Sequence, residues 1–354
     1  MRLRRSSCDR PGIRRRRRGK GFSYRHDDGS PATEEELARI RALAVPPAWA
    51  DVWICPWPNG HIQAYGTDNA GRRQYRYHDL WRERRHHEKF DKMLELGELL
   101  PALRSRVAFH LRGEDLSRER VLAAAVRLLD VASFRIGGEE YAEENDTYGL
   151  ASLRRKHVEV HDARIAFDFP ATLGVRRVSV VEDLDVARVF SELKARQGRG
   201  GLLVCRQDDH WRQLRSDDVN AYLKEWAGQQ FSAKDFRTWN ATVLAAVHLA
   251  RIERVPASES GQRRAVRQAL AQVADYLGNT PAVCRASYVD PRIVEVFRRG
   301  EGHALRDALV GRRTRRSREV AVLRILESKR GQRARRDGRQ GKGQQRNRPE
   351  SRAA

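Results

Sequence analysis

The sequence predicts an α+β protein with a small β-rich N-terminal domain, residues 21–95, and a larger, mostly α-helical domain, residues 96–310, that contains one small antiparallel sheet. In the first domain, short aromatic segments with strand character are joined by turn sequences. From about Leu100 onward, apolar residues recur with helical spacing instead. The two ends, residues 1–20 and 311–354, are rich in arginine and are expected to be disordered basic arms.

The net charge of +23 is concentrated at the two ends of the chain. Residues 1–20 carry ten Lys/Arg against one acid, and residues 311–354 carry sixteen against four, so the segment between them is nearly neutral. Arms of this kind favour electrostatic, sequence-independent attachment to a polyanion, most commonly a nucleic acid. Solvated tails without a function are the alternative.

Cysteine spacing and hydropathy argue against several other classes of protein. The four cysteines lie far apart without CxxC spacing, which indicates neither a zinc site nor a disulfide framework. No apolar run approaches the roughly 18 residues of a membrane helix, and no apolar stretch follows the arginine-rich start as it would in a secretory signal. Without a P-loop or a cluster of acids for Mg²⁺, we expect no metal and no cofactor. The chain is expected to be cytoplasmic.

The N-terminal domain contains three expected strands, residues 51–56, 61–67 and 73–78, with the turn sequences PNG and DNAGR between them. The third strand lies in the strip GRRQYRYH, which mixes cations and aromatic rings as a surface that follows phosphates does. This strip supplies four candidate DNA-binding residues, Arg72, Arg73, Tyr75 and Tyr77.

The second domain is expected to alternate helices with one group of strands. Helical periodicity covers 118–132, a further helix covers 183–196, another begins after a capping Ser216, and a long one covers 259–277 before the stop at Gly278. The strands are expected at residues 157–161, 164–169 and 176–180, with 170–174 (PATLG) as the loop between the last two.

Five residues in the second domain suggest chemistry when they are taken together. Arg135 precedes two glycines, which let a backbone approach a ligand closely. Lys234 and Arg237 are three residues apart, on one face if helical. Asn279 follows the long helix, and Tyr288 lies nine residues further on.

This set suits in-line attack on a phosphodiester. The two arginines would neutralise the non-bridging oxygens, Asn279 would donate to one of them, and Tyr288 would be the nucleophile. A protonated lysine could supply the proton for the leaving 5′-oxygen. Each residue alone has an ordinary alternative: a salt bridge for Arg135, a helix cap for Asn279, packing for Tyr288.

The order and wording of three stretches resemble the type IB DNA topoisomerases, in the small bacterial, poxvirus-like branch. They are FRIGGEEYAEENDTYGLASLRRKHV, AKDFRTWNAT and GNTPAVCRASYVDPRI, and GFSYRHDDGSP and IQAYGTDNAGRRQYRYH in the first domain also resemble that branch. The resemblance covers roughly residues 21–299. It implies a β-rich cap domain and a helical catalytic domain with the fold shared by tyrosine recombinases. It also implies a monomer that clamps duplex DNA, nicks one strand through a 3′-phosphotyrosine, lets the helix swivel and reseals the strand without ATP or metal.

Carried over by position, the resemblance makes Arg135 and Arg237 the two catalytic arginines and Tyr288 the nucleophile. Asn279 falls where poxvirus members carry histidine and bacterial members often carry asparagine, so a donor role is retained. Lys234 and Tyr141 match positions that contact the DNA backbone.

The sequence departs from the family pattern at one position. The family's catalytic lysine lies on the hairpin turn after the FDF-like strand, and here that turn, PATLGVRR, contains no lysine. Arg176 and Arg177 are the nearest cations, and arginine is a good phosphate clamp but a poor general acid because its pKa exceeds about 12. Lys156 or Lys234 reaching into the site is the alternative.

Three functions therefore stay open on the sequence alone. A type IB topoisomerase associated with the nucleoid is the leading hypothesis. A DNA-binding relative whose chemistry is impaired by the missing hairpin lysine is the second. A tyrosine recombinase, whose N-terminal domain is typically helical, is the third and least favoured.

Overall fold

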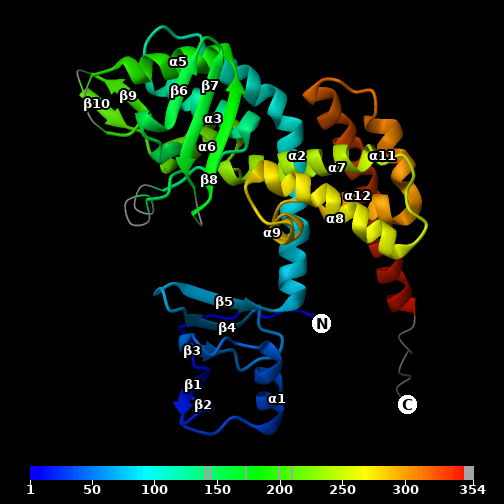
Figure 1. The fold of residues 1–354 in the computed structure, drawn as a ribbon. Helices are drawn as coiled ribbons and strands as arrows, with labels where there is room; N and C mark the ends of the chain where they lie inside the picture. Colours follow the sequence, from blue (N-terminus) through cyan, green and yellow to red (C-terminus); the bar gives the residue numbers. More distant parts are fainter. Residues whose placement is uncertain (139–141, 143–145, 172–173, 198–199, 209, 347–354) are drawn as a thin grey trace. The chain divides into compact units, whose positions relative to one another are not determined.

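The computed structural model describes residues 1–346 except 139–141, 143–145, 172–173, 198–199 and 209. The chain divides into two compact units, Met1–Phe90 and Asp91–Ala354. The predicted boundary at residue 95 falls inside helix α2 (Asp79–Leu111), which begins in the first unit. The predicted class is confirmed: a small β-rich unit is followed by a mostly helical one with small antiparallel sheets (Figure 1).

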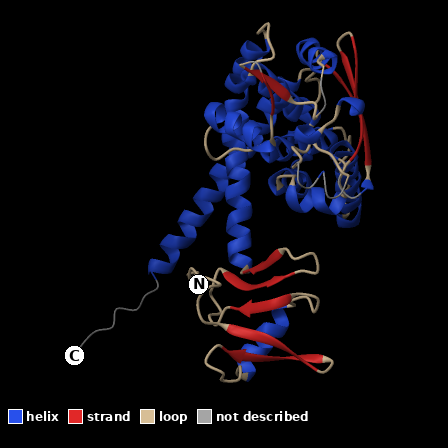
Figure 2. Ribbon diagram, turned by 90° about the vertical axis from the view of Figure 1, so that its left-hand side faces the viewer, coloured by secondary structure: helices blue, strands red, loops and turns tan. Residues whose placement is uncertain are grey.

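The first unit is a five-stranded antiparallel sheet with one helix on it (Figure 2). The strands lie in the order β2-β1-β3-β4-β5. Helix α1 contributes Ile40 to a core that it shares with Ile13, Val52, Ile54 and Ala64. The elements are β1 (Ile13–Arg18), β2 (Gly21–His26), α1 (Glu34–Leu43), β3 (Ala50–Ile54), β4 (Ile62–Thr67) and β5 (Arg73–Tyr77). Three of these, β3, β4 and β5, confirm the strands expected from the sequence.

The prediction that residues 1–20 are disordered is wrong. Strand β1 contains the arginine run and lies between β2 and β3, with Ile13 fully buried. The guanidinium of Arg15 stacks on the ring of Phe22 at 4.2 Å and donates to the carbonyls of Pro46, at 3.0 Å, and Trp49. Because an arginine stem can cover apolar surface while its head is held by carbonyl oxygens, the run is compatible with a strand.

The second unit places a three-stranded sheet, β6-β7-β8, next to helices α3 and α5, and gathers its remaining long helices around α7 (Figure 1). The predicted helices 118–132 and 259–277 are confirmed to the residue, each with a serine N-cap and a left-handed C-cap. All three predicted strands are also confirmed.

In chain order the unit continues from α2 with α3 (Arg118–Ala132), η1 (Leu150–Ser152), η2 (Arg155–His157), β6 (Val158–His161), β7 (Arg164–Pro170), β8 (Arg176–Glu182), α5 (Leu184–Ala195), β9 (Val204–Gln207), β10 (His210–Gln213), α6 (Ser216–Ala227), α7 (Ala233–Ala250), α8 (Glu259–Leu277), α9 (Pro281–Ser287), α10 (Pro291–Val296), the π-helical turn η4 (Phe297–Glu301), α11 (Gly302–Leu309) and α12 (Arg315–Arg346).

The prediction of disorder from residue 311 is also wrong for the first part of that segment. Helix α12 buries Ala321, Val322 and Leu326, and its buried Glu319 accepts two hydrogen bonds from Arg104. The apolar residues recur at helical spacing within a segment whose high average charge suggested a tail. Residues 347–354 lie outside the described part of the chain.

Candidate active site

Helix α7 supplies the most deeply buried cation of the candidate site. Its first turn carries Lys234, exposed, and Arg237, 2% exposed, and both line one pocket of about 260 Å³. The turn is fixed by Asp235, which accepts hydrogen bonds from the backbone N–H of Ser232 at 2.8 Å and from Lys92 Nζ at 2.7 Å. The expectation that Lys234 and Arg237 share a helix face is confirmed.

The guanidinium of Arg237 is held by backbone carbonyls at the ends of two helices. It donates to the carbonyl of Ser133, after α3, and at 2.9 Å to that of Leu277, the last residue of α8. Its carbon lies 5.3 Å from the ring centre of Tyr288, and its Nε is buried without a hydrogen-bond partner among the described residues. Burial lowers the pKa of Arg237, and Tyr288 partly offsets this.

Arg135 is placed by a close backbone contact that requires glycine. Gly137 has a φ of +74°, and a Cβ on it would lie 2.6 Å from the Cα of Gly149. This approach lets Leu150 N–H donate to the carbonyl of Arg135 at 2.9 Å. The two glycines suggested in the sequence that a backbone approaches a ligand, and at Gly137 the approaching partner is this chain itself.

The side chain of Arg135 is directed at the end of α8. Its Nη2 donates to the carbonyl of Gly278 at 3.0 Å and to Oδ1 of Asn279. Asn279 also caps the helix through its backbone N–H, which donates to Ala274 at 2.9 Å. Its Nδ2 is buried with no partner among the described residues. The ordinary reading of Asn279 as a cap is thus correct for its backbone, while its side chain presents a donor beside Arg135.

Tyr288 is the C-terminal cap of the short helix α9, and its side chain is half-buried. Its carbonyl accepts a hydrogen bond from Thr242 Oγ1 on α7 at 3.2 Å, and the same Oγ1 accepts from the backbone N–H of Asp290 at 3.1 Å. Asp290 is 1% exposed and paired with Arg292 at 2.8 Å. The backbone that follows Tyr288 is therefore fixed against the helix that carries Arg237.

The pocket of about 260 Å³ brings together side chains that are far apart in the sequence. It is lined by Arg135, Lys234, Arg237 and Tyr288. Asn279 does not line it but accepts a hydrogen bond from Arg135, which does. Four of the five residues expected to form the site therefore share a pocket, and the fifth lies next to it.

The two hairpin arginines differ in their surroundings. Arg176 is exposed and forms an ion pair with Asp168, and hydrogen bonding to that carboxylate raises the pKa of Arg176. Arg177 points inward, donates to the carbonyl of Ala132 at 2.9 Å and stacks over Phe134 at 5.1 Å. Burial, followed by the charge of Arg237, lowers the pKa of Arg177 to about 10.

A second pocket, of about 520 Å³, is lined by both hairpin arginines together with Arg135 and Gly278. Arg177 is the hairpin cation that lies against the site, since burial and then the charges of Arg237 and Arg135 lower its pKa. Lys156 is exposed and lines a different pocket, with Asp168 and Arg176.

The candidate DNA-binding residues of the first unit lie on and beside β5. Tyr75 and Tyr77 are each 39% exposed and stack with ring centres 5.9 Å apart, and Tyr65 on β4 lies 6.0 Å from Tyr75. Arg73 lies over Tyr65 at 5.9 Å. Arg72 instead pairs with Asp68 across a turn, and hydrogen bonds from the Arg72 backbone, first, and side chain lower the pKa of Asp68 to about 2.

Tyr141 lies outside the described residues. No helix in the described ranges is long and apolar enough to cross a membrane. Within the same ranges no three His, Cys, Asp or Glu side chains are grouped so that they could hold a metal ion.

Sequence reasoning missed Asn240 and Arg315. Asn240 donates to the carbonyl of Asp130 at 2.7 Å, and Arg315 donates to the same carbonyl at 2.8 Å. Asn240 lies in the motif AKDFRTWNAT, one helical turn after Arg237, so its position relative to that arginine was a usable signal. Arg315 lies among many other arginines and carries no such signal.

Comparison with known proteins identifies two matching families. Residues 78–296 match the catalytic core of eukaryotic DNA topoisomerase I, and residues 21–68 match the N-terminal domain of bacterial DNA topoisomerase IB. DNA topoisomerase 1B of Acanthamoeba polyphaga mimivirus is 29% identical over 293 residues, which cover 81% of this chain and 87% of the viral protein.

Cellular relatives match over a shorter stretch. DNA topoisomerase 1 of Daucus carota is 32% identical over 159 residues, and that of Schizosaccharomyces pombe is 31% identical over 164 residues. These matches cover 44% and 46% of this chain but only 19% of each relative.

Proposed function

Because the chain belongs to the type IB DNA topoisomerase family, whose substrate is DNA, we propose that it relaxes supercoiled duplex DNA by a transient single-strand break at Tyr288. The observation that carries this proposal is the position of Tyr288: its ring lies 5.3 Å from the guanidinium carbon of the buried Arg237, in a pocket that Arg135 also lines. A tyrosine that shares a pocket with two arginines is suited to attack a phosphodiester that the arginines bind.

The proposed cleavage step is a transesterification. The Tyr288 hydroxyl loses its proton to solvent as its oxygen attacks the phosphorus, the bond to the 5′-oxygen breaks, and that oxygen takes up a proton and leaves as a 5′-hydroxyl. The DNA 3′ end is then held as a phosphotyrosine. Since one phosphodiester is exchanged for another, the reverse reaction reseals the strand without nucleotide hydrolysis. Between the two steps the free 5′ end rotates and supercoils are lost.

The site residues are proposed to stabilise the charge that develops on the phosphate. Arg237 Nε and Asn279 Nδ2 are buried donors without a partner among the described residues, so each can donate to a non-bridging oxygen without losing a bond. Arg135 adds a second positive charge, and Lys234 at the start of α7 adds a cation for the adjacent backbone.

Arg177 is the proposed proton donor to the leaving 5′-oxygen. An ordinary arginine is a poor acid, but the pKa of Arg177 is lowered to about 10, close to the value of roughly 10.4 for an ordinary lysine. Both hairpin arginines line a pocket with Arg135, but Arg177 is the one whose pKa is lowered by burial and then by the charges of Arg237 and Arg135, whereas Arg176 is held by Asp168. This assignment would explain how the site tolerates a hairpin turn without lysine.

In the first unit, we propose that the exposed face formed by Arg73, Tyr75 and Tyr77 contacts DNA, since exposed rings between cations suit a phosphate-lined surface. The protein is proposed to act as a monomer in the nucleoid. The match of residues 21–68 to a bacterial topoisomerase IB domain favours this function over that of a tyrosine recombinase.

Plasmid relaxation tests the proposal. Wild-type protein is expected to relax supercoiled plasmid in EDTA without ATP, and to leave protein covalently attached to nicked DNA when the reaction is stopped with detergent. Tyr288→Phe is expected to bind duplex DNA with wild-type affinity and to give neither product. Covalent adducts formed by Tyr288→Phe would refute the assignment of the nucleophile. Absence of relaxation by a wild-type protein that binds DNA would support a chemically impaired relative instead.

A further inference from the structure

The last turn of helix α3 is a meeting point for side chains from other elements of the second unit. The four consecutive carbonyl oxygens of residues 130–133 each accept a hydrogen bond from a side chain outside α3. The donors are Asn240 and Arg315 to Asp130, Tyr276 to Val131, Arg177 to Ala132, and Arg237 to Ser133.

This arrangement has a simple physical cause. The last four carbonyls of a helix have no partner within the helix, and they form the negative end of its dipole. Cationic and neutral donors are therefore attracted to them. Two of the donors, Arg177 and Arg237, belong to the proposed active site, so the position of this turn determines where those two guanidinium groups lie.

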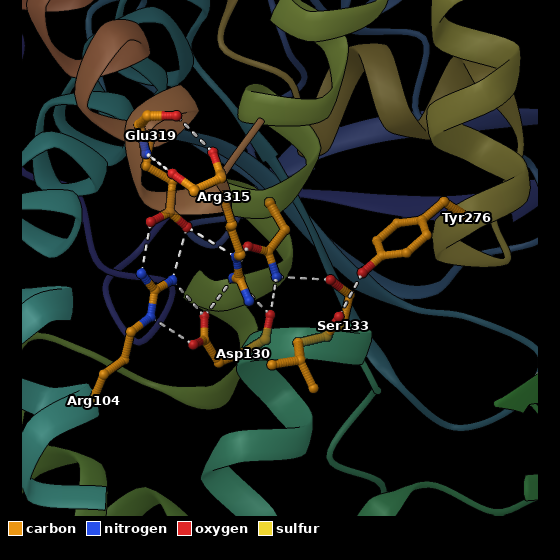
Figure 3. A network of polar contacts seen from close by, with 10 residues as sticks. Arg104, Asp130, Ser133, Tyr276, Arg315 and Glu319 are labelled. Atoms are coloured by element: carbon orange, nitrogen blue, oxygen red, sulfur yellow. Dashed lines mark hydrogen bonds and ion pairs between the residues drawn. The ribbon is translucent and has the colours of Figure 1, made fainter. Parts of the chain in front are cut away.

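The turn is fixed in place by a buried cluster of ionic residues (Figure 3). Arg104 on α2 makes a bidentate contact with Asp130, at 2.7 and 3.0 Å, and another with Glu319, at 2.6 and 2.7 Å. Asp130 and Glu319 are 3% and 4% exposed. Burial lowers the pKa of Arg104, but its hydrogen bonds to Glu319 and Asp130 outweigh burial and the pKa is raised.

Arg315 on α12 joins this cluster to the helix that carries Arg237. Its Nε donates to Glu319 at 3.0 Å, and its Nη2 donates to a carboxylate oxygen of Asp130 at 2.5 Å and to Oδ1 of Asn240 at 2.9 Å. Asn240 in turn donates to Ser133 Oγ at 2.8 Å. A single guanidinium thus links α12, the end of α3 and the middle of α7.

We propose that Arg315 is a positioning residue for DNA cleavage and that helix α12, through it, completes the active site of the second unit. The inference rests on the proposed function, since it concerns the same arginines. Arg315 does not line the pocket that holds Tyr288; it acts through the α3 turn on Arg177 and Arg237. It also lies outside residues 78–296, the part that matches the topoisomerase catalytic core.

The test compares Arg315→Ala with Arg316→Ala, which removes the same charge from an exposed neighbour on the same helix. Cleavage is measured at saturating protein on supercoiled plasmid, by trapping the covalent adduct over time, and duplex affinity is measured by fluorescence anisotropy. Arg315→Ala is expected to slow cleavage by about 10- to 100-fold, the effect of a displacement of order 1 Å, with affinity unchanged within about twofold. Arg316→Ala is expected to cleave at the wild-type rate.

Two further variants separate positioning from general stability. Arg315→Lys keeps a charge that can reach Asp130 but cannot also hold Asn240 and Glu319, so it is expected to restore cleavage only in part. In an Arg237→Lys background, the lysine cannot bridge the two carbonyls, so adding Arg315→Ala is expected to slow cleavage by a smaller factor than it does in wild type, with the remaining loss acting through Arg177.

Several outcomes would overturn the proposal: wild-type cleavage by folded Arg315→Ala, an equal loss in Arg316→Ala, a parallel loss of affinity, or full additivity with Arg237→Lys. If the alanine variant does not fold, Arg315→Lys and Arg315→Gln, which keep a donor, decide the question, and wild-type rates in both would overturn it. If wild-type protein forms no adduct, the proposed function fails instead, and the two failures are thereby distinguished.

Discussion

Arg177 is expected to lower the stability of the folded protein although it is proposed to act in catalysis. Its pKa is lowered from the ordinary value of an arginine to about 10, first by burial and then by the charge of Arg237, with Arg135 contributing in the same direction. A difference of this size corresponds to roughly 3 kcal/mol of unfavourable free energy for keeping the charge in the folded state. Its hydrogen bond to the Ala132 carbonyl and its contact with Phe134 offset about 2 kcal/mol of this cost.

Replacing Arg177 with methionine keeps much of the volume and removes the charge. Arg177→Met is therefore expected to raise the free energy of unfolding of the second unit by about 1 kcal/mol at pH 8. It is also expected to slow adduct formation by about 100-fold or more, because the proton donor is lost.

The stability gain should depend on pH in a defined direction. Below pH 10 the guanidinium is charged in both the folded and the unfolded state, so the full penalty is present in the wild type. As the pH rises above 10, the folded state loses the proton before the unfolded state does, and the penalty fades. The difference between wild type and Arg177→Met should therefore shrink as the pH rises through 10.

Urea unfolding followed by circular dichroism measures this difference, with each transition of the two-unit chain fitted separately. Arg176→Met is the matched control, since Arg176 is exposed and its pairing with Asp168 raises its pKa. That variant is expected to lose a little stability and to keep cleavage within a few-fold of wild type. If Arg177→Met loses as much stability as Arg176→Met, the charge of Arg177 is not a net cost and the reasoning is refuted.

Three further predictions follow from local geometry. Gly137→Ala should destabilise the second unit by about 2 kcal/mol or more and slow cleavage, because its Cβ would meet Gly149 and its φ is positive. Gly138→Ala, whose Cβ would meet no described atom within 4 Å, should leave the free energy of unfolding unchanged; urea unfolding measures this contrast and adduct formation measures the loss in Gly137→Ala. Asn279→Ala should slow adduct formation by about 10- to 100-fold and Asn279→His should recover part of it, since histidine keeps a donor; equal rates for the two would refute the donor role. Deleting residues 1–18 should unfold the first unit, because the deletion removes β1. Deleting residues 332–354 should leave both units folded and flatten the salt dependence of duplex binding, and an unchanged salt slope would mean that this segment does not touch DNA.

The elements that the sequence predicts well are those whose signals are local. Helices 118–132 and 259–277 each combine a serine N-cap, a continuous apolar stripe and a left-handed residue at the C-terminal end, and their predicted bounds are confirmed. The strands β6, β7 and β8 alternate in the expected way. These features depend on neighbours within a few residues.

The errors occur where a regional average outweighed a few informative residues. The arginine run in β1 looks like a solvated arm, but Ile13 and the carbonyls that accept from Arg15 make it a strand. In α12 the buried acid Glu319 and the apolar residues around Val322 outweigh the surrounding charge. A high net charge predicts disorder only for segments in which apolar residues do not recur at helical or strand spacing.

In the candidate site, too, some features could be predicted from the sequence and others required the structure. The residue types and motifs indicated Arg135, Arg237, Asn279 and Tyr288, and the fold brings them together, although their roles stay predictions. The choice between the two hairpin arginines required the structure, because burial and the charge of Arg237 distinguish them only in three dimensions.

The contacts at the end of α3 also bear on the order in which the chain folds. Arg315 and Asp130 are 185 residues apart, Arg104 and Glu319 are 215 apart, and Arg237 is 104 residues from Ser133. Contacts between such distant segments form late, because the entropy of closing long loops must be overcome before they contribute. A partly folded chain would then carry Tyr288 without its arginines in place. Such an intermediate could bind DNA through its positive charge, yet would be unable to break a strand until folding is complete.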